Sequence, residues 1–173
     1  MMESLERSGE GLSIADLREG DLSAALAIYN DVIATTTAVY SEIPATADYW
    51  ARWFAERRER GFPVLAAYSD GELIGFGSFG EFRPWPCYET TVEHSVHVRA
   101  DRRRHGAGTR LMHSLIDRAA DAGKHVMIAG IDAGNLSSLA LHAKLGFVEV
   151  GRLPAVARKF GRWLDLVYLH RKL

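Results

Sequence analysis

The stretch that decides the fold is Val96–Leu115, which reads VHVRADRRRHGAGTRLMHSL. It begins at the end of a strand expected over Thr90–Arg99, and it ends in apolar residues at helical spacing. Between them lies a basic turn, Arg102–Gly108, in which Gly106 and Gly108 allow a ligand to approach the backbone. Free N–H groups and the dipole at the start of a helix attract anions, and three arginines add positive charge. The turn therefore predicts a phosphate-binding site.

The glycine spacing of the turn excludes two common phosphate-binding motifs. A dinucleotide-binding fingerprint would need a third glycine where Leu111 stands, and a Walker loop would need a Gly-Lys-Ser/Thr sequence. What remains is the pattern Gln/Arg-x-x-Gly-x-Gly/Ala, met by Arg103–Gly108. Here the chain resembles the GCN5-related N-acetyltransferases (the GNAT family), in which this turn holds the pyrophosphate of acetyl-CoA. The alternative is a solvated arginine-rich loop.

Further segments extend the resemblance. Asn135–Phe147 is similar to the second signature of the family, with His142 where many relatives have tyrosine. Thr35–Ala38, Thr91–Val96 and Lys159–Asp165 resemble the subgroup of phosphinothricin and methionine sulfoximine (or sulfone) acetyltransferases. The resemblance covers the chain from about residue 14 to its end. It implies a GNAT fold of the α/β class: a mixed central β-sheet splayed between its middle strands, with helices on both faces.

Hydrophobic periodicity supports a mixed α/β domain, because strands outnumber helices and follow one another in the middle of the chain. Residues 1–11 are expected to be a flexible N-terminal tail, and residues 12–173 a single GNAT domain. In the helix expected to end at Arg60, the run Arg57–Arg60 is expected on the exposed side. The expected elements are a strand over Leu12–Leu17, a helix from Asp21 (its N-cap) to Ile33, a loop over Ala34–Pro44, a helix from Thr46 or Asp48 to Arg60, a hairpin of Val64–Ser69 and Glu72–Phe79 around Asp70-Gly71, a loop over Glu81–Tyr88, the strand and helix flanking the basic turn, a strand over Val126–Ile131, a helix over Asn135–Leu145 ended by Gly146, and strands over Phe147–Gly151 and Trp163–Leu169.

Composition excludes several classes of protein. The chain has 173 residues, of which 47% are hydrophobic and 25% charged, as in one globular domain. Its 21 Lys+Arg against 22 Asp+Glu exclude a globally basic nucleic-acid binder. A single cysteine, Cys87, excludes an internal disulfide and a cysteine-rich zinc module. No apolar run approaches the ~20 residues needed to cross a bilayer. We expect a cytoplasmic protein without nucleic-acid or membrane partners.

Acetyl transfer to an amine requires removal of the ammonium proton, because an ammonium has no lone pair. The resemblance implies that Glu93 is the base, acting through a water; the alternative is a carboxylate on a sheet face balanced by Arg83 or Arg99. It implies a catalytic role for His142 too, as an acid toward the CoA sulfur or as a second base. The alternative there is a helix histidine packed in the core.

Binding residues follow from the same resemblance. The backbone of Val96–Val98 would pair with the pantetheine arm, and the basic turn would hold the pyrophosphate. Asn135 would reach the pantetheine or phosphate region, although it also fits a helix cap. Arg83 would bind the carboxylate of an amino-acid substrate, and the stiff Pro84–Cys87 segment leaves the amino-acid preference open. Cofactor contacts are expected at Val96, His97, Val98, Arg103, Arg104, His105, Gly106, Ala107, Gly108, Asn135 and Ser138, and substrate contacts at Phe82, Arg83, Glu93 and His94.

The expected activity is transfer of the acetyl group of acetyl-CoA to the α-amine of a small amino acid or analogue, of the methionine sulfoximine, methionine sulfone or phosphinothricin type, by a homodimer. Three alternatives stay open: another amine (a polyamine, an antibiotic or a protein N-terminus), a non-catalytic CoA-binding module, and a nucleic-acid-binding module that uses the basic runs Arg57–Arg60 and Arg99–His105. No metal is expected, because His94 and His97 fall on opposite faces of a strand and the H-E-x-x-H pattern is missing.

Overall fold

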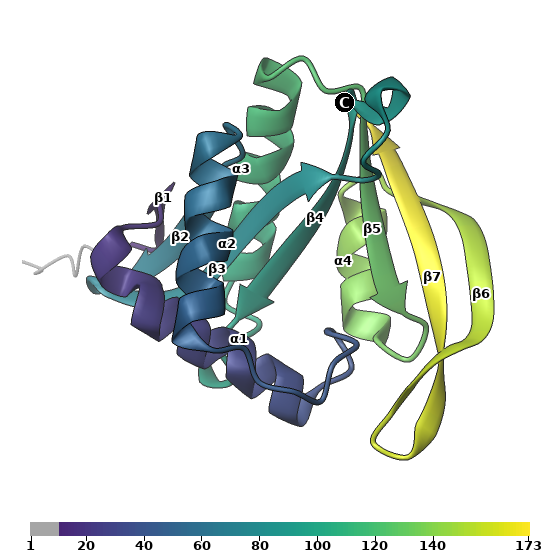
Figure 1. Cartoon of the computed structure of the whole chain (residues 1–173), viewed down its shortest axis with the longest axis horizontal. Coiled ribbons are helices and arrows are strands. Elements are labelled where there is room, and N and C mark those ends of the chain that lie inside the picture. Colours follow the sequence, from purple (N-terminus) through teal and green to yellow (C-terminus); the bar gives the residue numbers. More distant parts are fainter. Residues whose placement is uncertain (1–10) are drawn as a thin grey trace, which may run out of the picture.

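The computed structural model describes residues 11–173 (Figure 1). All of the predicted tail except Gly11 lies outside the described residues. The order of elements agrees with the order expected from the periodicity. The elements are β1 (Ser13–Asp16), α1 (Leu22–Thr35), α2 (Ala47–Glu59), β2 (Val64–Ser69), β3 (Glu72–Glu81), β4 (Thr91–Val98), α3 (Ala107–Asp121), β5 (Val126–Asp132), α4 (Leu136–Lys144), β6 (Val148–Lys159) and β7 (Arg162–Lys172).

The strands form one seven-stranded sheet in the order β1-β2-β3-β4-β5-β7-β6. Strands β4 and β5 are parallel, and the other neighbours are antiparallel. β4 pairs with β3 along its whole length, but it pairs with β5 only from Thr91↔Val126 to Glu93↔Ile128. Beyond Glu93 the two strands separate, as Figure 1 shows. The predicted mixed sheet, splayed between its middle strands, is confirmed.

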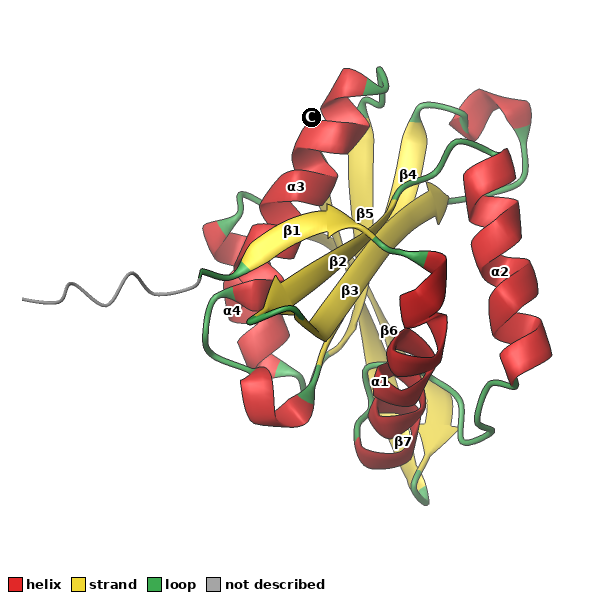
Figure 2. Ribbon diagram, turned by 90° about the vertical axis from the view of Figure 1, so that its left-hand side faces the viewer, coloured by secondary structure: helices red, strands yellow, loops and turns green. Residues whose placement is uncertain are grey.

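Two pairs of helices cover the two faces of the sheet (Figure 2). α1 and α2 pack on one face, where Trp50 and Phe54 join the first core with Phe76 of β3. α3 packs on the other face, where its apolar stripe, including Leu111 and Leu115, is fully buried in the second core. The helical spacing of these apolar residues explains why each helix buries one stripe. The described residues include no helix long and apolar enough to cross a membrane.

Local sequence signals account for several boundaries. Asp70 and Gly71 have φ values of 53° and 78°, as the predicted two-residue hairpin turn requires. The side chain of Thr46 accepts a hydrogen bond from the Tyr49 amide and begins α2. Gly146, with a φ of 82°, ends α4. These features confirm predictions that depended on neighbouring residues alone.

Two side-chain predictions were wrong. Asp21 stands at the start of α1 without capping it, because its carboxylate accepts hydrogen bonds from the Tyr68 hydroxyl, at 2.7 Å, and from Arg18. Arg57 is not on the exposed side of α2: its guanidinium is half-buried and donates to the Phe79 carbonyl at 2.8 Å. In both cases a partner distant in the sequence decides the position of the side chain.

The last hairpin is longer than predicted. β6 extends from Val148 to Lys159, well past the expected end at Gly151, and its pairing with β7 is irregular between Leu153 and Ala157. It is one of the two edge strands of the sheet, where a proline such as Pro154 is tolerated. Most of its residues are exposed, so it lacks the run of buried residues that marks strands such as β2 and β3.

Candidate active site

The basic turn leaves the start of α3 open. Gly106 has a φ of 85° and occupies the N-cap position, where no side chain caps the helix. A methyl group at Gly108 would meet only Val98 and Leu141, at the ordinary distances of 3.8 and 3.9 Å. The protein interior therefore does not require a glycine at position 108. Its small size leaves the helix N-terminus accessible to an anion, as the sequence predicts.

The arginines of the turn fall into two groups. Arg102 lies within 3.8 Å of carboxylate oxygens of Glu72 and Asp101. Arg103 and Arg104 have no carboxylate partner among the described residues, and Arg103 donates to the Val98 carbonyl at 3.2 Å. His105 is exposed, and its Nδ1 donates to the Arg103 carbonyl at 2.8 Å, which shapes the turn. Positive charge is thus unneutralised at the two positions assigned to the pyrophosphate.

The edge of β4 that faces the split carries free backbone groups. From His94 to Val98 this edge has no strand partner, because the pairing with β5 ends at Glu93. The ring of His97 does not point into the split: it lies 5.3 Å from the rings of Tyr29 and Phe76, under α1. Burial lowers the pKa of His97 to about 4. Only the backbone of this residue is placed for the predicted pantetheine contact.

Asn135 caps α4 at the far side of the split. Its Oδ1 accepts hydrogen bonds from the Ser138 amide, at 3.2 Å, and from the Ser137 hydroxyl, at 3.1 Å. The predicted cap is confirmed. Asn135 and Ser138, both expected to contact a cofactor, therefore lie together in the first turn of the helix that follows β5.

Glu93 is the last residue of β4 that pairs with β5, and its side chain lies over the backbone of Gly130. A methyl group at Gly130 would be 3.2 Å from Glu93 Oε1. Burial raises the pKa of Glu93, and the positive charge of Arg83 partly opposes the rise. A carboxyl group with a raised pKa is suited to proton transfer near neutral pH. The alternative in which Arg99 balances Glu93 is wrong, because Arg99 pairs with Glu72 and Asp101.

Arg83 is exposed and held near its own backbone. Its Nη1 donates to the Phe82 carbonyl at 2.8 Å, and its guanidinium lies 4.0 Å from the centre of the Phe82 ring. Phe82 also contacts Tyr168, whose ring lies beside Gly130. Among residues 11–173, no carboxylate oxygen lies within 4.0 Å of the Arg83 guanidinium. This guanidinium is free to bind a carboxylate on the same sheet face as Glu93.

His142 and His94 face each other on the opposite side of the sheet. His142 of α4 is buried, and its Nε2 lies 3.1 Å from His94 Nε2. Both rings contact the Phe147 ring, at 5.7 Å from His94 and 5.1 Å from His142. Burial lowers the pKa of His142, and it lowers that of His94 to about 3. Consecutive residues of a strand point to opposite faces, so His94 is not beside Glu93, where the sequence analysis placed both as substrate contacts.

Sequence reasoning missed the residues that close the site on the Glu93 face. Asp132 shares this face with Gly130, since the two are two residues apart on β5. Its carboxylate accepts a hydrogen bond from the Thr37 hydroxyl, which binds the loop after α1 to the end of β5. The buried Lys159 holds the same loop by donating to the carbonyls of Ile33 and Val39, at 2.7 and 2.8 Å. Thr35–Ala38 and Lys159–Asp165 were named from the sequence only for their resemblance to the subgroup. Nothing in the sequence indicates that the two segments lie close together.

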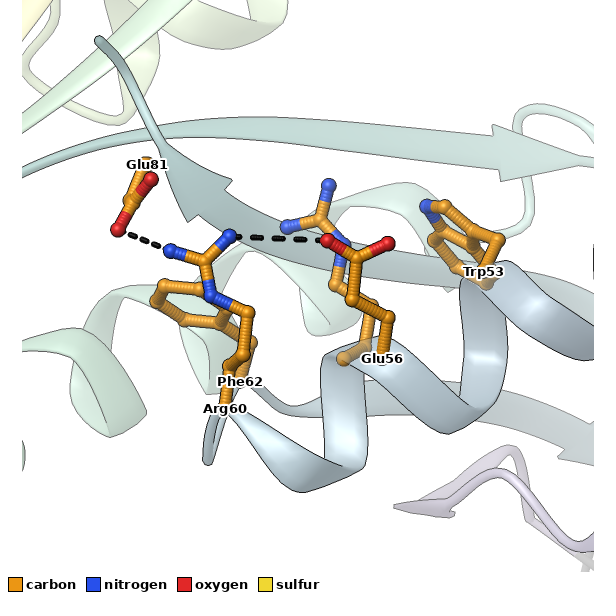
Figure 3. Close-up of a pocket in the computed structure, with 6 residues that line it drawn as sticks. Trp53, Glu56, Arg60, Phe62 and Glu81 are labelled. Atoms are coloured by element: carbon orange, nitrogen blue, oxygen red, sulfur yellow. Dashed lines mark ion pairs between the residues drawn. The ribbon is translucent and has the colours of Figure 1, made fainter. Parts of the chain in front are cut away.

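A pocket of about 150 Å³ lies between α2 and the end of β3 (Figure 3). In it, Arg60 forms ion pairs with Glu56 and Glu81, and Glu81 directly precedes the Phe82–Arg83 segment. No residue expected for catalysis or for binding acetyl-CoA or the amino acid lines this pocket. The ion pair of Arg60 with Glu81 anchors the base of the loop that carries Arg83. The lining residues are Trp53, Glu56, Arg57, Arg60, Phe62 and Glu81.

Comparisons with known proteins agree with this geometry. Residues 25–147 match the model of the acetyltransferase (GNAT) family. The chain is 46% identical to an L-methionine sulfoximine/L-methionine sulfone acetyltransferase of Pseudomonas aeruginosa, over 93% of this chain and 94% of the relative. It is 38% identical to a phosphinothricin N-acetyltransferase of Alcaligenes faecalis, over 91% of this chain and 80% of the relative. The structure of yncA, a putative acetyltransferase from Salmonella typhimurium with its cofactor acetyl-CoA, superimposes with a TM-score of 0.92 at 37% identity, covering 94% of each chain.

Proposed function

The chain belongs to the acetyltransferase (GNAT) family, and from this membership we propose that it acetylates the α-amine of a small amino acid or analogue that carries a carboxylate. The relatives named above act on methionine sulfoximine, methionine sulfone and phosphinothricin, and we propose a substrate of this type. One observation carries the proposal: the half-buried Glu93 carboxyl group shares a sheet face, beside the split, with the guanidinium of Arg83, which has no carboxylate partner among residues 11–173.

Acetyl-CoA is the acetyl donor of this family, and several features of the chain fit it. The open N-terminus of α3 suits a pyrophosphate, as do Arg103 and Arg104, which have no carboxylate partner in the described part of the chain. The free edge of β4 beyond Glu93 suits the amides of an extended arm. Bound acetyl-CoA supplies an activated acetyl group and a thiolate as leaving group. The proposed cofactor contact at His97 is a backbone contact, since the His97 ring points away from the split. At Ser138 the hydroxyl is the group proposed for the contact, because the amide donates to Asn135 and the carbonyl accepts from His142.

In the proposed mechanism, Arg83 binds the substrate carboxylate and thereby orients the neighbouring amine toward the split. Glu93 accepts the ammonium proton through a water, which gives the amine the lone pair needed to attack the acetyl carbonyl. Backbone N–H groups on the free edge of β4 are available to stabilise the negative charge that develops on the carbonyl oxygen. His142 lies on the opposite face of the sheet, so the two predicted catalytic side chains border the split from its two sides.

We further propose that residues 12–173 act as one domain and that two copies associate through β6 and β7. Exposed apolar side chains gather on this hairpin, including Val150, Val156, Phe160 and Trp163. Leu164 and Val167 of β7 are buried in the chain's own core and are not part of this exposed surface. Sedimentation velocity would test the dimer, and a monomer at micromolar concentration would contradict it. A cytoplasmic location stays a prediction.

The activity is tested by release of free thiol from acetyl-CoA with a panel of amines: methionine sulfoximine, methionine sulfone, phosphinothricin, a polyamine, an aminoglycoside and a peptide with a free N-terminus. We expect turnover with the first three. Turnover only with the polyamine, the aminoglycoside or the peptide would show that the enzyme acetylates another class of amine. A thermal shift with acetyl-CoA but no thiol release would indicate a non-catalytic CoA-binding module. Salt-dependent DNA binding without that shift would indicate a nucleic-acid-binding module.

A further inference from the structure

The ring of His142 is fixed by contacts at both of its nitrogens. Nδ1 lies 2.7 Å from the carbonyl oxygen of Ser138, one turn earlier in α4. Nε2 lies 3.1 Å from Nε2 of His94 on β4. The two ring planes are inclined by only 12°, and their centres are 5.1 Å apart. This arrangement places the two Nε2 atoms in line for a single hydrogen bond between the rings.

The partners determine where the protons lie. A carbonyl oxygen only accepts, so Nδ1 of His142 carries a proton and donates to Ser138. The Ser138 hydroxyl, at 3.4 Å from the same nitrogen, is a much weaker partner. Burial lowers the pKa of His142 and so favours the neutral ring, in which Nε2 is unprotonated when Nδ1 carries the proton. The proton between the rings therefore belongs to Nε2 of His94.

The remaining nitrogen of the pair supports this assignment. Nδ1 of His94 is buried and has no hydrogen-bond partner among the described residues. If it carried the proton, an N–H donor would be buried without an acceptor, and two lone pairs would face each other at 3.1 Å. The assignment above leaves one unpaired acceptor instead. The titratable groups that influence His94 are His142 and His97, with no carboxylate among them, so no acid nearby favours a charged ring.

From these contacts we propose that His94 is a positioning residue: by donating from its Nε2, it holds His142 in the neutral tautomer that is protonated on Nδ1. His94 stands where β4 and β5 begin to separate, and it connects β4 to α4 across the split. This tautomer distinguishes the two roles expected of His142, an acid toward the CoA sulfur and a second base. Its Nε2 has no proton to give, so in the unliganded protein His142 is an acceptor and not an acid toward the CoA sulfur.

The inference is tested first without any reaction. In protein labelled with 15N at its seven histidines, long-range 1H–15N spectra distinguish the two neutral tautomers and the imidazolium of each ring. His94→Asn and His142→Asn assign the signals, and His113→Asn on the exposed side of α3 is the control. We expect His142 to be the Nδ1–H tautomer and His94 the Nε2–H tautomer from pH 7 to 8. An Nε2–H tautomer or an imidazolium at His142 would overturn the proposal.

Two substitutions of His94 separate positioning from packing. The side-chain amide of His94→Gln can reach the donor position of Nε2, whereas that of His94→Asn ends near the position of Nδ1. In the Gln variant we expect His142 to keep its tautomer. In the Asn variant we expect a mixture of tautomers. Thermal unfolding checks that both variants are folded. Identical His142 signals in two folded variants would contradict the assigned role.

The kinetic consequence rests on the proposed function. With methionine sulfone as the acceptor, we expect kcat of His94→Gln within about threefold of the wild type. We expect kcat of His94→Asn to fall at least about tenfold, with the Kd for acetyl-CoA unchanged. Equal kcat losses in both variants would contradict a positioning role. If no amine is acetylated by the wild type, the proposed function fails, while the spectra still decide the tautomer.

Discussion

The Glu93 carboxylate rests against the backbone of Gly130, the residue of β5 whose side-chain position would be 3.2 Å from Oε1. The lack of a side chain at Gly130 makes room for the carboxylate between β4 and β7, where Leu166 and Tyr168 also border the space. The position of Glu93, the proposed base, therefore depends on Gly130 of the neighbouring strand β5, a residue that has no functional group.

Gly130→Ala tests this relationship. The added methyl group is expected to displace the Glu93 carboxylate by a few tenths of an ångström and to lower kcat by about three- to tenfold, because misplaced catalytic groups lose rate steeply. Gly20→Ala is the matched control, since a methyl group there has nothing within 4 Å. Steady-state kinetics on both variants decide the point. An unchanged kcat in Gly130→Ala would show that Glu93 does not depend on this space.

Glu93→Gln is expected to lower kcat by about 10²- to 10⁴-fold, the usual contribution of a general base. The Kd for acetyl-CoA should stay the same, because Glu93 lies away from the basic turn. In the wild type, kcat/KM should rise with pH through an apparent pKa above the ordinary value of a glutamate, since burial raises the pKa of Glu93. Glu59→Gln, on the exposed side of α2, is the control. A variant with wild-type turnover at saturating amine would remove Glu93 from the mechanism.

Arg83→Ala is expected to raise KM for amino-acid substrates by about tenfold or more, because a charge-assisted pair with the substrate carboxylate is lost. Turnover at saturating substrate should change less. Arg118→Ala is a suitable control, as the exposed Arg118 of α3 pairs with Asp16 of β1, away from the proposed site. If KM rises equally in both variants or in neither, the carboxylate is bound elsewhere.

The sequence predicted well those features that depend on neighbouring residues. The Gly106 turn, the Asn135 cap and the Asp70-Gly71 hairpin each follow from a few consecutive residues. The contacts of Gly130 with Glu93 and of His94 with His142 depend on register and on helix placement across the sheet, which one sequence does not specify. For the same reason Arg57 was expected on the exposed side of α2, whereas its Nη1 occupies the space where Gly80 has no side chain.

The buried histidines predict a loss of stability in acid. Burial lowers the pKa of His97 to about 4, whereas an unfolded histidine titrates near 6.5. Below pH 6.5 the unfolded chain therefore binds a proton that the folded chain does not. The free energy of unfolding falls by up to about 1.4 kcal/mol per pH unit from this residue, until about pH 4.

Urea unfolding of wild type and His97→Phe from pH 4 to 7 measures this contribution. The variant keeps an aromatic ring beside Tyr29 and Phe76, and its stability should depend less steeply on pH. His113→Asn, an exposed histidine, should follow the wild type. Parallel curves for wild type and His97→Phe would mean that His97 is not neutral in the folded protein.

The most direct test of the central claim compares two acceptors that differ only by the carboxylate: methionine sulfone and 3-(methylsulfonyl)propylamine, the same compound without that group. The quantity measured is kcat/KM for thiol release from acetyl-CoA, with mass spectrometry of the N-acetylated product. We predict a preference for methionine sulfone of at least about 100-fold, because a site built to bind a charged group rejects the analogue that lacks it. Equal kcat/KM values for the two amines would contradict the account.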